Sequence, residues 1–266
     1  MPRIKMYTCF TDSHKEMFER YFQPSVPDSF ELFPTQFEQE CTTGEYHSDG
    51  WIQAVSRKVE VILGAIESVR NDDGPDYFVF SDCDIQFFSD LSGHIHELMQ
   101  TYDFIAMDDN FYCTGFMGIH ANDHAKFMWE WIGEHLAEYG CDQPAGNGFL
   151  KLHRKAHRAK KYLPRFMLPA KYRQHLMIPQ MRVGMFPRIE YFNHMHLGTE
   201  PSEWDPNSPI TFTDEQLGKM RMMHANFTMG IQNKIKLLEI VGEQKRRFDS
   251  HNASTGSTER AELRRA

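Results

Sequence analysis

Two aspartates at the end of an apolar strand constrain this chain more than any other feature of its sequence. The stretch YFVFSDCD places Asp82 and Asp84 directly after residues 77–81, which have strand character, and the apolar run IQFF resumes at once. Burying an unpaired carboxylate costs several kcal/mol or more. Asp82 and Asp84 therefore require a cation or a ring of hydrogen-bond donors, and the fold has to bring that partner to them.

The segments around this strand alternate between strand and helix patterns. Strands are expected at 4–10, 30–33, 77–81, 103–107 and 115–120. Helices are expected at 13–22, 50–70, 89–99 and 122–137, with a polar loop at 38–49. Such alternation is typical of an α/β protein with a parallel sheet. We predict one domain with two halves, residues 1–120 and residues 121–248.

The second half of the chain is less regular. Its features are a basic segment at 151–161, a proline-punctuated stretch at 164–209, a helix opening with the capping-box pattern at Thr213, and a final helix at 230–245. Residues 249–266 are polar and low in apolar content, which predicts a disordered tail.

Composition excludes several classes of protein. With 266 residues, 41% apolar residues and a net charge of −8, the chain is expected to be globular and soluble, and its surface does not suit nucleic acid. We expect no membrane span, because the longest apolar run is short and the first residues lead straight into a strand. The five cysteines include no CxxC pair, which favours free thiols, a cytoplasmic location and no zinc site.

The spacing of the two aspartates favours a metal site. Residues i and i+2 of a strand project to the same face, so Asp82 and Asp84 converge at the carboxyl end of the strand, where open α/β sheets bind ligands. Carboxylates suit Mn²⁺ or Mg²⁺, and a cation with few protein ligands leaves positions for a diphosphate. A solvated loop is the alternative, and the apolar flanks disfavour it. Haloacid-dehalogenase-like phosphatases also carry two aspartates at this spacing after a strand, but near the N-terminus and normally followed by a small residue and Thr. Here Ile85 and Gln86 follow Asp84, which disfavours that interpretation.

A more distant segment offers the partner that the aspartates need. In HANFTMGIQNKIKLL, His224 precedes Gly230 and Lys234 at the entrance of the last predicted helix. An imidazole suits a metal, while a glycine, a helix N-terminus and a lysine together suit a diphosphate. Taken alone, His224 would be read as a structural histidine.

Lys58 is the one cation inside an otherwise apolar helix stripe. That stripe comprises Trp51, Val55, Val59, Ile62, Ile66 and Val69. Two interpretations stay open: Lys58 extends its ammonium past the apolar rim to water, or it contacts a phosphate or carboxylate.

In this order, the motifs resemble those of GT-A glycosyltransferases, specifically the nucleotide-diphospho-sugar transferase group. The resemblance covers residues 3–245 and is carried by GW before Lys58, FVFSDCDIQFF, TGFMGI, Asp142-Gln143, and HANF with its downstream Gly and Lys. It implies a Rossmann-like, mixed but mainly parallel sheet flanked by helices. It also implies a UDP-sugar donor and a glycan or other hydroxyl acceptor. Residues 1–120 would then form the nucleotide-sugar-binding half, and residues 121–248 the acceptor-side half that completes the metal and diphosphate site.

The resemblance also implies roles for individual residues. Asp84 and His224 would ligate Mn²⁺ or Mg²⁺, with Asp82 contacting the metal or the donor ribose. Lys58 and Lys234 would lie near the diphosphate. The other implied donor contacts are Thr8, Phe10, Thr11, Thr114 and Gly230, with the backbone of residues 8–11 against the nucleobase. One position departs from the family pattern: Cys113 stands where the family usually has Asn. Because an amide of the donor pocket is lost, the resemblance does not imply which sugar is transferred.

The implied catalytic residues are Asp142 and Gln143, which would face the transferred sugar. An amide is too weak a base for inversion, so we expect transfer with retention of the anomeric configuration. Asp108 and Asp109 are the alternative, because either would serve as an inverting base if its loop reached the acceptor. Two other functions stay open: a metal-dependent phosphohydrolase, and a non-catalytic protein that binds sugar nucleotides or glycans.

The basic segment KLHRKAHRAKK, from Lys151 to Lys161, contains six Lys or Arg and no acid. It suits an anionic membrane surface or a charged acceptor, and a solvated helix face is the plainer interpretation. His153 and His157 have the i, i+4 spacing of a metal pair, but the surrounding cations would repel a divalent ion.

Overall fold

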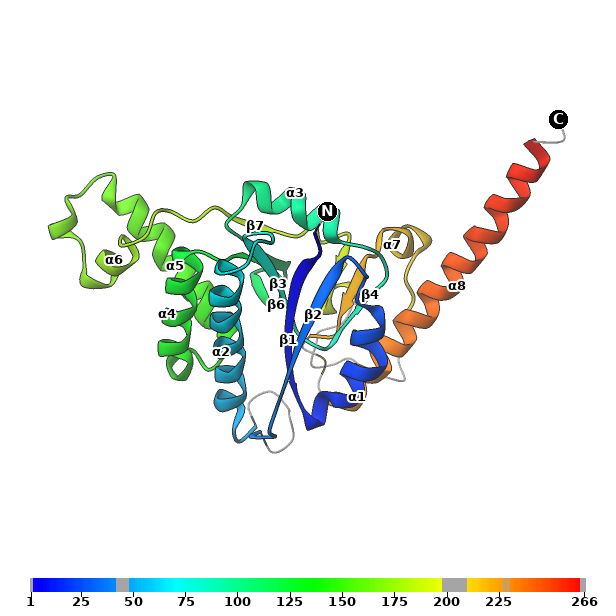
Figure 1. The fold of residues 1–266 in the computed structure, drawn as a ribbon, viewed down its shortest axis with the longest axis horizontal. Helices are drawn as coiled ribbons and strands as arrows, with labels where there is room; N and C mark the ends of the chain where they lie inside the picture. The colour runs from blue at the N-terminus through cyan, green and yellow to red at the C-terminus, as the bar shows by residue number, and fades with distance from the viewer. Residues whose placement is uncertain (1, 42–47, 198–209, 227, 229, 264–266) are drawn as a thin grey trace.

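A six-stranded mixed sheet forms the centre of the molecule (Figure 1). In the computed structural model, which describes residues 2–41, 48–197, 210–226, 228 and 230–263, the strand order is β2-β1-β3-β6-β5-β7. The bounds are β1 Ile4–Thr11, β2 Phe30–Phe37, β3 Tyr77–Ser81, β5 Phe104–Asp108, β6 Tyr112–His120 and β7 Val183–Met185.

The sheet is mainly parallel, as predicted. β1 pairs in parallel with β2 and β3, and β5 does so with β7, whereas β6 lies antiparallel between β3 and β5. A hairpin at 109–111, with Asn110 at a φ of 59°, joins β5 to β6 and is too short to allow a parallel return. A second sheet has the order β4-β9-β8, with the bounds β4 Ile85–Phe87, β8 Tyr191–Phe192 and β9 Met222–His224.

Helices cover both faces of the large sheet. Phe78 and Phe80 of β3 pack with α2, α4 and α5, while Tyr77 and Val79 point to the other face, where α3 and α8 contribute to the core. This alternation follows the two-residue period of a strand. The bounds are α1 Lys15–Met17, α2 Trp51–Arg70, α3 Ser92–Thr101, α4 Asp123–Tyr139, α5 Asp142–Lys160, α6 Ala170–His175, α7 Asp214–Lys219 and α8 Ile231–Leu263.

Two predicted helix starts are confirmed by their local chemistry. α2 begins after Gly50, whose φ is 85° and where a Cβ atom would lie 2.1 Å from the carbonyl oxygen of Glu40, so a side chain does not fit. α7 begins at the predicted capping box, in which the Thr213 hydroxyl accepts a hydrogen bond from the backbone N–H of Gln216. The regular helix predicted at 13–22 is wrong: one α-turn, α1, lies between 3₁₀ and π turns.

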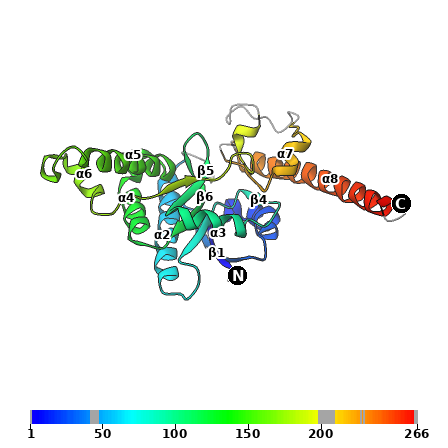
Figure 2. The ribbon, with the colours of Figure 1, turned by 90° about the horizontal axis from the view of Figure 1, so that it is seen from above.

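The last helix extends beyond its predicted end. We expected it to stop near residue 245 and a disordered tail to begin at 249, but α8 continues to Leu263 and projects from the body of the molecule (Figures 1 and 2). A helix satisfies its own backbone hydrogen bonds without burial, and ion pairs one turn apart, such as Lys245 with Asp249 at 2.7 Å, support it. No helix in the described part of the chain is long and apolar enough to cross a bilayer.

Candidate functional site

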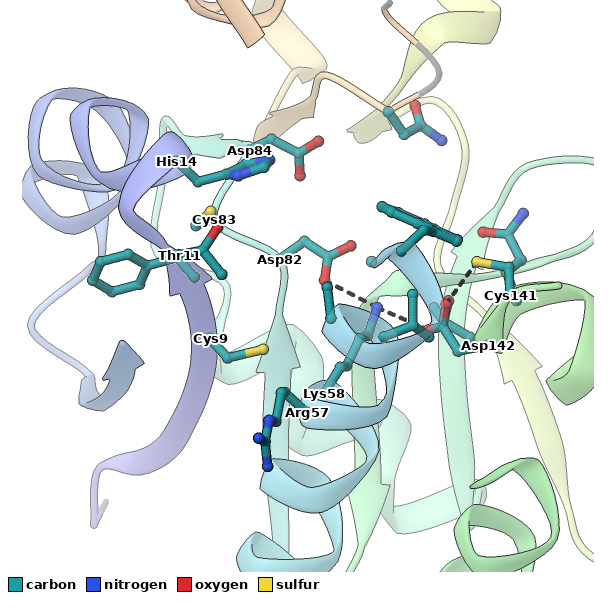
Figure 3. Close-up of a pocket in the computed structure, with 18 of the residues that line it drawn as sticks. Cys9, Thr11, His14, Arg57, Lys58, Asp82, Cys83, Asp84, Cys141 and Asp142 are labelled. Atoms are coloured by element: carbon teal, nitrogen blue, oxygen red, sulfur yellow. Dashed lines mark hydrogen bonds and ion pairs between the residues drawn. The ribbon is translucent and has the colours of Figure 1, made fainter. Parts of the chain in front are cut away.

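The two aspartates lie where the large sheet gives way to the small one. β3 ends at Ser81, the backbone N–H of Asp82 donates to the carbonyl oxygen of Gly115 on β6 at 2.7 Å, and the chain then enters β4 of the second sheet. A cavity of about 560 Å³ opens at this point. The carboxylates of Asp82 and Asp84 point into the same space, next to α2 and the end of β1 (Figure 3).

Sheet pairing brings His224 to the aspartates across 140 residues of sequence. Ile85 of β4 is the register partner of His224 on β9, so the imidazole lies beside Asp84 with Nε2 3.1 Å from Oδ1. One ligand atom from each of Asp82, Asp84 and His224 lies within 4.8 Å of the others. Two carboxylate oxygens and an imidazole nitrogen fit Mn²⁺ or Mg²⁺, so the donor set predicted from the sequence is assembled in the structure.

Asp84 is the most strongly stabilised carboxylate of the cavity. Its burial opposes ionisation, but Lys234, with Nζ 2.6 Å from Oδ2, and His224 outweigh that effect and hold the pKa of Asp84 well below its ordinary value. Burial likewise opposes the charged imidazole, yet Asp84 raises the pKa of His224 to about 10. Asp84 therefore stays ionised and faces two cationic partners at neutral pH.

Lys58 does not reach solvent along the apolar rim of its helix. Its ammonium lies 3.0 Å from Oδ1 of Asp82 and 3.0 Å from Oδ2 of Asp142, and its side chain is 10% exposed (Figure 3). The same ammonium lies 5.1 Å from the ring centroid of Phe80. Burial disfavours its charge, but Asp142 and Asp82 together hold the pKa of Lys58 well above its ordinary value. The structure therefore resolves the open question in favour of a carboxylate contact.

Asp142 begins α5 and is buried beside Lys58. Burial would raise its pKa, but the Lys58 charge and a hydrogen bond from the thiol of Cys141, 3.0 Å from Oδ1, lower it. At the first turn of a helix a carboxylate is also favoured by the helix dipole. Asp142 and Lys58 thus form a fixed, ionised pair on one wall of the cavity.

Gln143 belongs to a network of amides beside that wall. Its Nε2 donates to Oδ2 of Asp109 at 3.3 Å, and Nδ2 of Asn226 donates to the same oxygen at 3.4 Å. Asn226 also lies 3.9 Å from the Cys113 sulfur, and Nδ1 of His224 lies 3.8 Å from that sulfur. Asn226 lines the cavity and so presents an amide next to the position where Cys113 replaces the usual Asn.

The N-terminus of α8 completes the side of the cavity next to Asp84. Gly230, at a φ of 83°, precedes the helix, and its carbonyl oxygen accepts a hydrogen bond from the backbone N–H of Lys234. Gly230 and Lys234 both line the cavity. Gly115 of β6 lies next to the same histidine: a Cβ atom there would lie 2.1 Å from Cε1 of His224 and 3.0 Å from Oδ2 of Asp82, so glycine is required. A helix N-terminus with a lysine in its first turn favours an anion such as a diphosphate.

Most of the residues singled out from the sequence line this one cavity. They are Phe10, Thr11, Lys58, Asp82, Asp84, Thr114, Asp142, Gln143, His224, Gly230 and Lys234. Thr8 is the exception, because its side chain is fully buried within β1 and Cys9 lines the cavity in its place.

Sequence reasoning missed several lining residues, among them His14, Trp51, Arg57, Asn226 and Thr228. Asn226 and Thr228 stand within the same segment as His224, and His14 follows the carboxyl end of β1, so their proximity to the motif was the available signal. Burial and then the nearby Lys234 lower the pKa of His14 to about 4, so this histidine is neutral.

Comparison with known proteins agrees with this geometry. Residues 77–238 match the profile of a family described as nucleotide-diphospho-sugar transferase. No curated protein matches the chain. A glycosyltransferase involved in glycosylation of the major capsid of PBCV-1 has a similar structure, with a TM-score of 0.50 at 10% identity over 90% of this chain and 100% of the other.

Two further solved structures have lower similarity. The bifunctional glycosyltransferase WbbM has a TM-score of 0.45 at 11% identity, over 89% of this chain and 50% of the other. The galactosyltransferase LgtC, in complex with donor and acceptor sugar analogues, has a TM-score of 0.40 at 8% identity, over 90% and 96% of the two chains. The expected GT-A architecture, a mainly parallel sheet flanked by helices in one domain, is confirmed by the fold and by the PBCV-1 neighbour.

Proposed function

Because the chain belongs to the nucleotide-diphospho-sugar transferase family, we propose that it is a DxD-type glycosyltransferase that moves a sugar from a UDP-sugar to a hydroxyl acceptor. We further propose that the reaction requires a divalent cation and retains the anomeric configuration, with a glycan as the simplest acceptor. The proposal rests chiefly on one cavity in which Asp82, Asp84 and His224 stand close enough to share an ion.

Asp82, Asp84 and His224 would hold the cation, Mn²⁺ or Mg²⁺. When bound there, such an ion supplies Lewis acidity that stabilises negative charge on a leaving diphosphate. His224 ligates an ion only as the neutral imidazole, whereas beside Asp84 alone it carries a proton up to a pKa of about 10. Ion binding at this histidine would therefore release a proton.

The donor fits between the two lysines of the cavity. Lys234 and the N-terminus of α8 lie on the side of Asp84, and Lys58 lies between Asp82 and Asp142, so positive charge brackets the cation ligands. This arrangement favours a diphosphate beside Asp84 and the nucleobase toward Phe10 and Thr11 at the end of β1. Fixed charges and dipoles of this kind stabilise the leaving group without reorganisation during reaction.

Asp142 and Gln143 occupy the wall where the transferred sugar would lie. Asp142 is held ionised by Lys58 and would accept hydrogen bonds from sugar hydroxyls. The Gln143 amide has its nitrogen engaged by Asp109, so its oxygen is the end available to the sugar. An amide oxygen is not a general base, which supports transfer on the leaving-group side of the sugar.

The two alternative bases named from the sequence are engaged elsewhere. Oδ1 of Asp108 pairs with Nη2 of Arg188 at 2.6 Å, and Asp109 accepts from Gln143 and Asn226. Neither residue is among the described residues that line the cavity. These contacts favour retention and give Asp109 the role of positioning Gln143.

The test of this function is the configuration of the first-formed product. Proton NMR of a reaction with a UDP-sugar, Mn²⁺ and an acceptor should show the same anomeric configuration as the donor. The opposite configuration would remove the retaining assignment and return Asp108 or Asp109 to consideration as the base. Orthophosphate or sugar phosphate released without acceptor would indicate a phosphohydrolase, and tight nucleotide binding without turnover would indicate a binding protein.

We also propose that the protein works in the cytoplasm. Five cysteines without a CxxC pair suit a reducing compartment, and four of the five are buried as free thiols. If free thiols are first blocked in denatured protein and the protein is then reduced, cysteines that react with a maleimide only after the reduction would contradict this proposal, because they would have been oxidised in the cell.

A further inference from the structure

The segment 151–177, called here the α5–α6 lobe, projects from one end of the molecule. It comprises the second half of α5, the turn at Arg165–Met167 and helix α6, and it lies at the end opposite the C-terminal part of α8 (Figures 1 and 2). A small core of its own, made of Ala156, Leu168 and Leu176, holds the lobe together. The lobe is therefore a built element whose outward side chains are placed by packing.

Large apolar side chains on this lobe point away from its core. Tyr162 and Phe166 are 79% and 78% exposed, and Leu163, Met167 and Met177 are exposed as well. Among the described residues, only Phe111 and Ile189 outside the lobe are comparably exposed large apolar side chains. Leu168 stands directly after this group and is buried, so the exposed residues are those that the lobe leaves outside its core. A cluster of exposed apolar side chains of this kind marks a contact surface.

The same lobe concentrates positive charge without any acid. Residues 143–189 contain no Asp or Glu, and nine Lys or Arg fall between 151 and 173, in a chain whose net charge is −8. In the described part of the chain, none of these nine forms an ion pair, whereas the cations of the cavity are all paired with carboxylates. Lys151, Lys155 and Lys171 line a groove between α4, α5 and α6, in which Glu138 of α4 is the one acid among the described lining residues. Unpaired cations in this number would be stabilised by an anionic partner.

We propose that the α5–α6 lobe docks on an anionic phospholipid membrane, with Tyr162, Leu163, Phe166 and Met167 entering the interface and the lysines and arginines facing the lipid headgroups. Aromatic rings are favoured at the boundary between headgroups and acyl chains, and nearby Lys and Arg add attraction to anionic lipid. Nucleic-acid bases would stack on the rings, but they offer nothing to the exposed aliphatic side chains of Leu163, Met167 and Met177, whereas a membrane interface accepts both kinds of side chain. The lobe binds in the plane of the surface and does not span it.

Vesicle flotation of the full chain tests this proposal without nucleotide, so its outcome does not depend on the proposed glycosyl transfer. The protein should float with vesicles of phosphatidylcholine mixed with phosphatidylglycerol and stay behind with phosphatidylcholine alone. The double variant Tyr162→Ser, Phe166→Ser removes exposed rings, and Lys160→Glu, Lys161→Glu reverses exposed charge. Each should weaken binding to the mixed vesicles by about tenfold or more.

Matched controls lie elsewhere on the surface. Ile189→Ser changes an exposed apolar residue outside the lobe, and Lys219→Glu with Lys236→Glu reverses two lysines whose side chains are about half exposed. Both controls should float as the wild type does. No binding to mixed vesicles at low salt would overturn the proposal. Undiminished binding by the Tyr162, Phe166 variant would also overturn it. The lobe would then bind anionic surfaces by its positive charge alone, and an acidic protein or RNA would become the preferred partner.

Discussion

The cations of the cavity are paired with carboxylates, whereas those of the α5–α6 lobe lie in a segment that contains no acid. In the cavity Lys58, with its side chain 10% exposed, and the partly exposed Lys234 are each within 3.0 Å of a carboxylate. On the lobe nine cations are spread over a segment without any acid, next to exposed aromatic rings. A charge removed from water requires a partner built into the fold, whereas an exposed charge keeps its hydration and is available to a partner outside the molecule. The comparison therefore separates residues that form a site from residues that form a surface.

The largest effect is expected when a buried carboxylate of the cavity is removed. Asp84→Ala would leave Lys234 and His224 facing each other without an anion, and would remove a ligand of the proposed cation. We expect glycosyl transfer to fall by about 10³-fold or more and the free energy of unfolding to fall by about 3 kcal/mol. Initial rates and urea titration measure the two quantities.

A suitable control for that variant is Asp73→Ala, which removes an exposed aspartate in the turn before β3. It should change stability by less than about 0.5 kcal/mol and leave the rate unaltered. Equal behaviour of the two alanine variants would show that Asp84 is not part of a functional site.

Lys58→Met tests whether the buried positive charge of the cavity is needed for activity. The substitution keeps the apolar stem of the side chain but leaves Asp82 and Asp142 close together without their shared cation. We expect a loss of activity of about 10²-fold, in line with the removal of one preorganised charge from an active site. The exposed ion pair of Lys126 with Glu67 provides the control, since Lys126→Met should alter stability by less than about 1 kcal/mol. Full activity and unchanged stability in Lys58→Met would refute the role of this lysine.

Acid should affect the lobe through its buried histidines. Nε2 of His153 accepts a hydrogen bond from the backbone N–H of Met181 at 3.2 Å, and burial, then His157 and His175, lower its pKa from 6.5 to about 4. The unfolded chain therefore binds more protons below pH 6.5, and stability should decrease as the pH falls from about 6.5 toward about 4. At pH 5 this one residue accounts for about 2 kcal/mol at most.

Denaturant titrations at pH 7 and pH 5 measure this dependence. His153→Gln has no titrating ring and should lower the difference in stability between the two pH values, whereas Gln174→Ala, which changes an exposed, uncharged residue of α6, should not. A pH dependence identical in all three proteins would show that His153 carries no part of it.

The smallest effect is expected at the projecting end of α8. Deletion of everything after Phe248 removes the projecting part of α8 and, with Asp249, the carboxylate partner of the buried Lys245. Because Asp249 is half exposed, stability should change by no more than about 1 kcal/mol, and activity should be unaltered. Loss of soluble protein on this truncation would show that the segment from 249 contributes to the folded domain.

Much of the fold and site could be predicted because several levels of the sequence agree. The alternating strand and helix patterns and the Thr213 capping box point to the observed elements. The conjunction of Asp82, Asp84, His224, Gly230 and Lys234 was predicted as a unit, and these residues line one cavity. Their proximity follows from the pairing of β4 with β9, which places His224 and the start of α8 next to the aspartates that end β3.

The rest depends on tertiary contacts that no local pattern contains. The short strands β4, β8 and β9 are two or three residues long and are formed by pairing across the chain, so period-two patterning does not detect them. Asn226 stands near His224 in the sequence, but its contacts with Asp109 and Cys113 depend on the placement of β9 against β4. The exposed rings of the lobe were likewise hidden, because Tyr162 and Phe166 look like core residues until packing leaves them outside.

The most direct test of the account is the dependence of nucleotide binding on a divalent cation. Calorimetric titration of UDP into the protein should show binding in the presence of Mn²⁺, little or none with EDTA, and none by Asp84→Ala under either condition. Asp73→Ala should behave as the wild type. UDP affinity that is the same with Mn²⁺ and with EDTA would contradict the claim that Asp82, Asp84 and His224 hold a cation for the diphosphate.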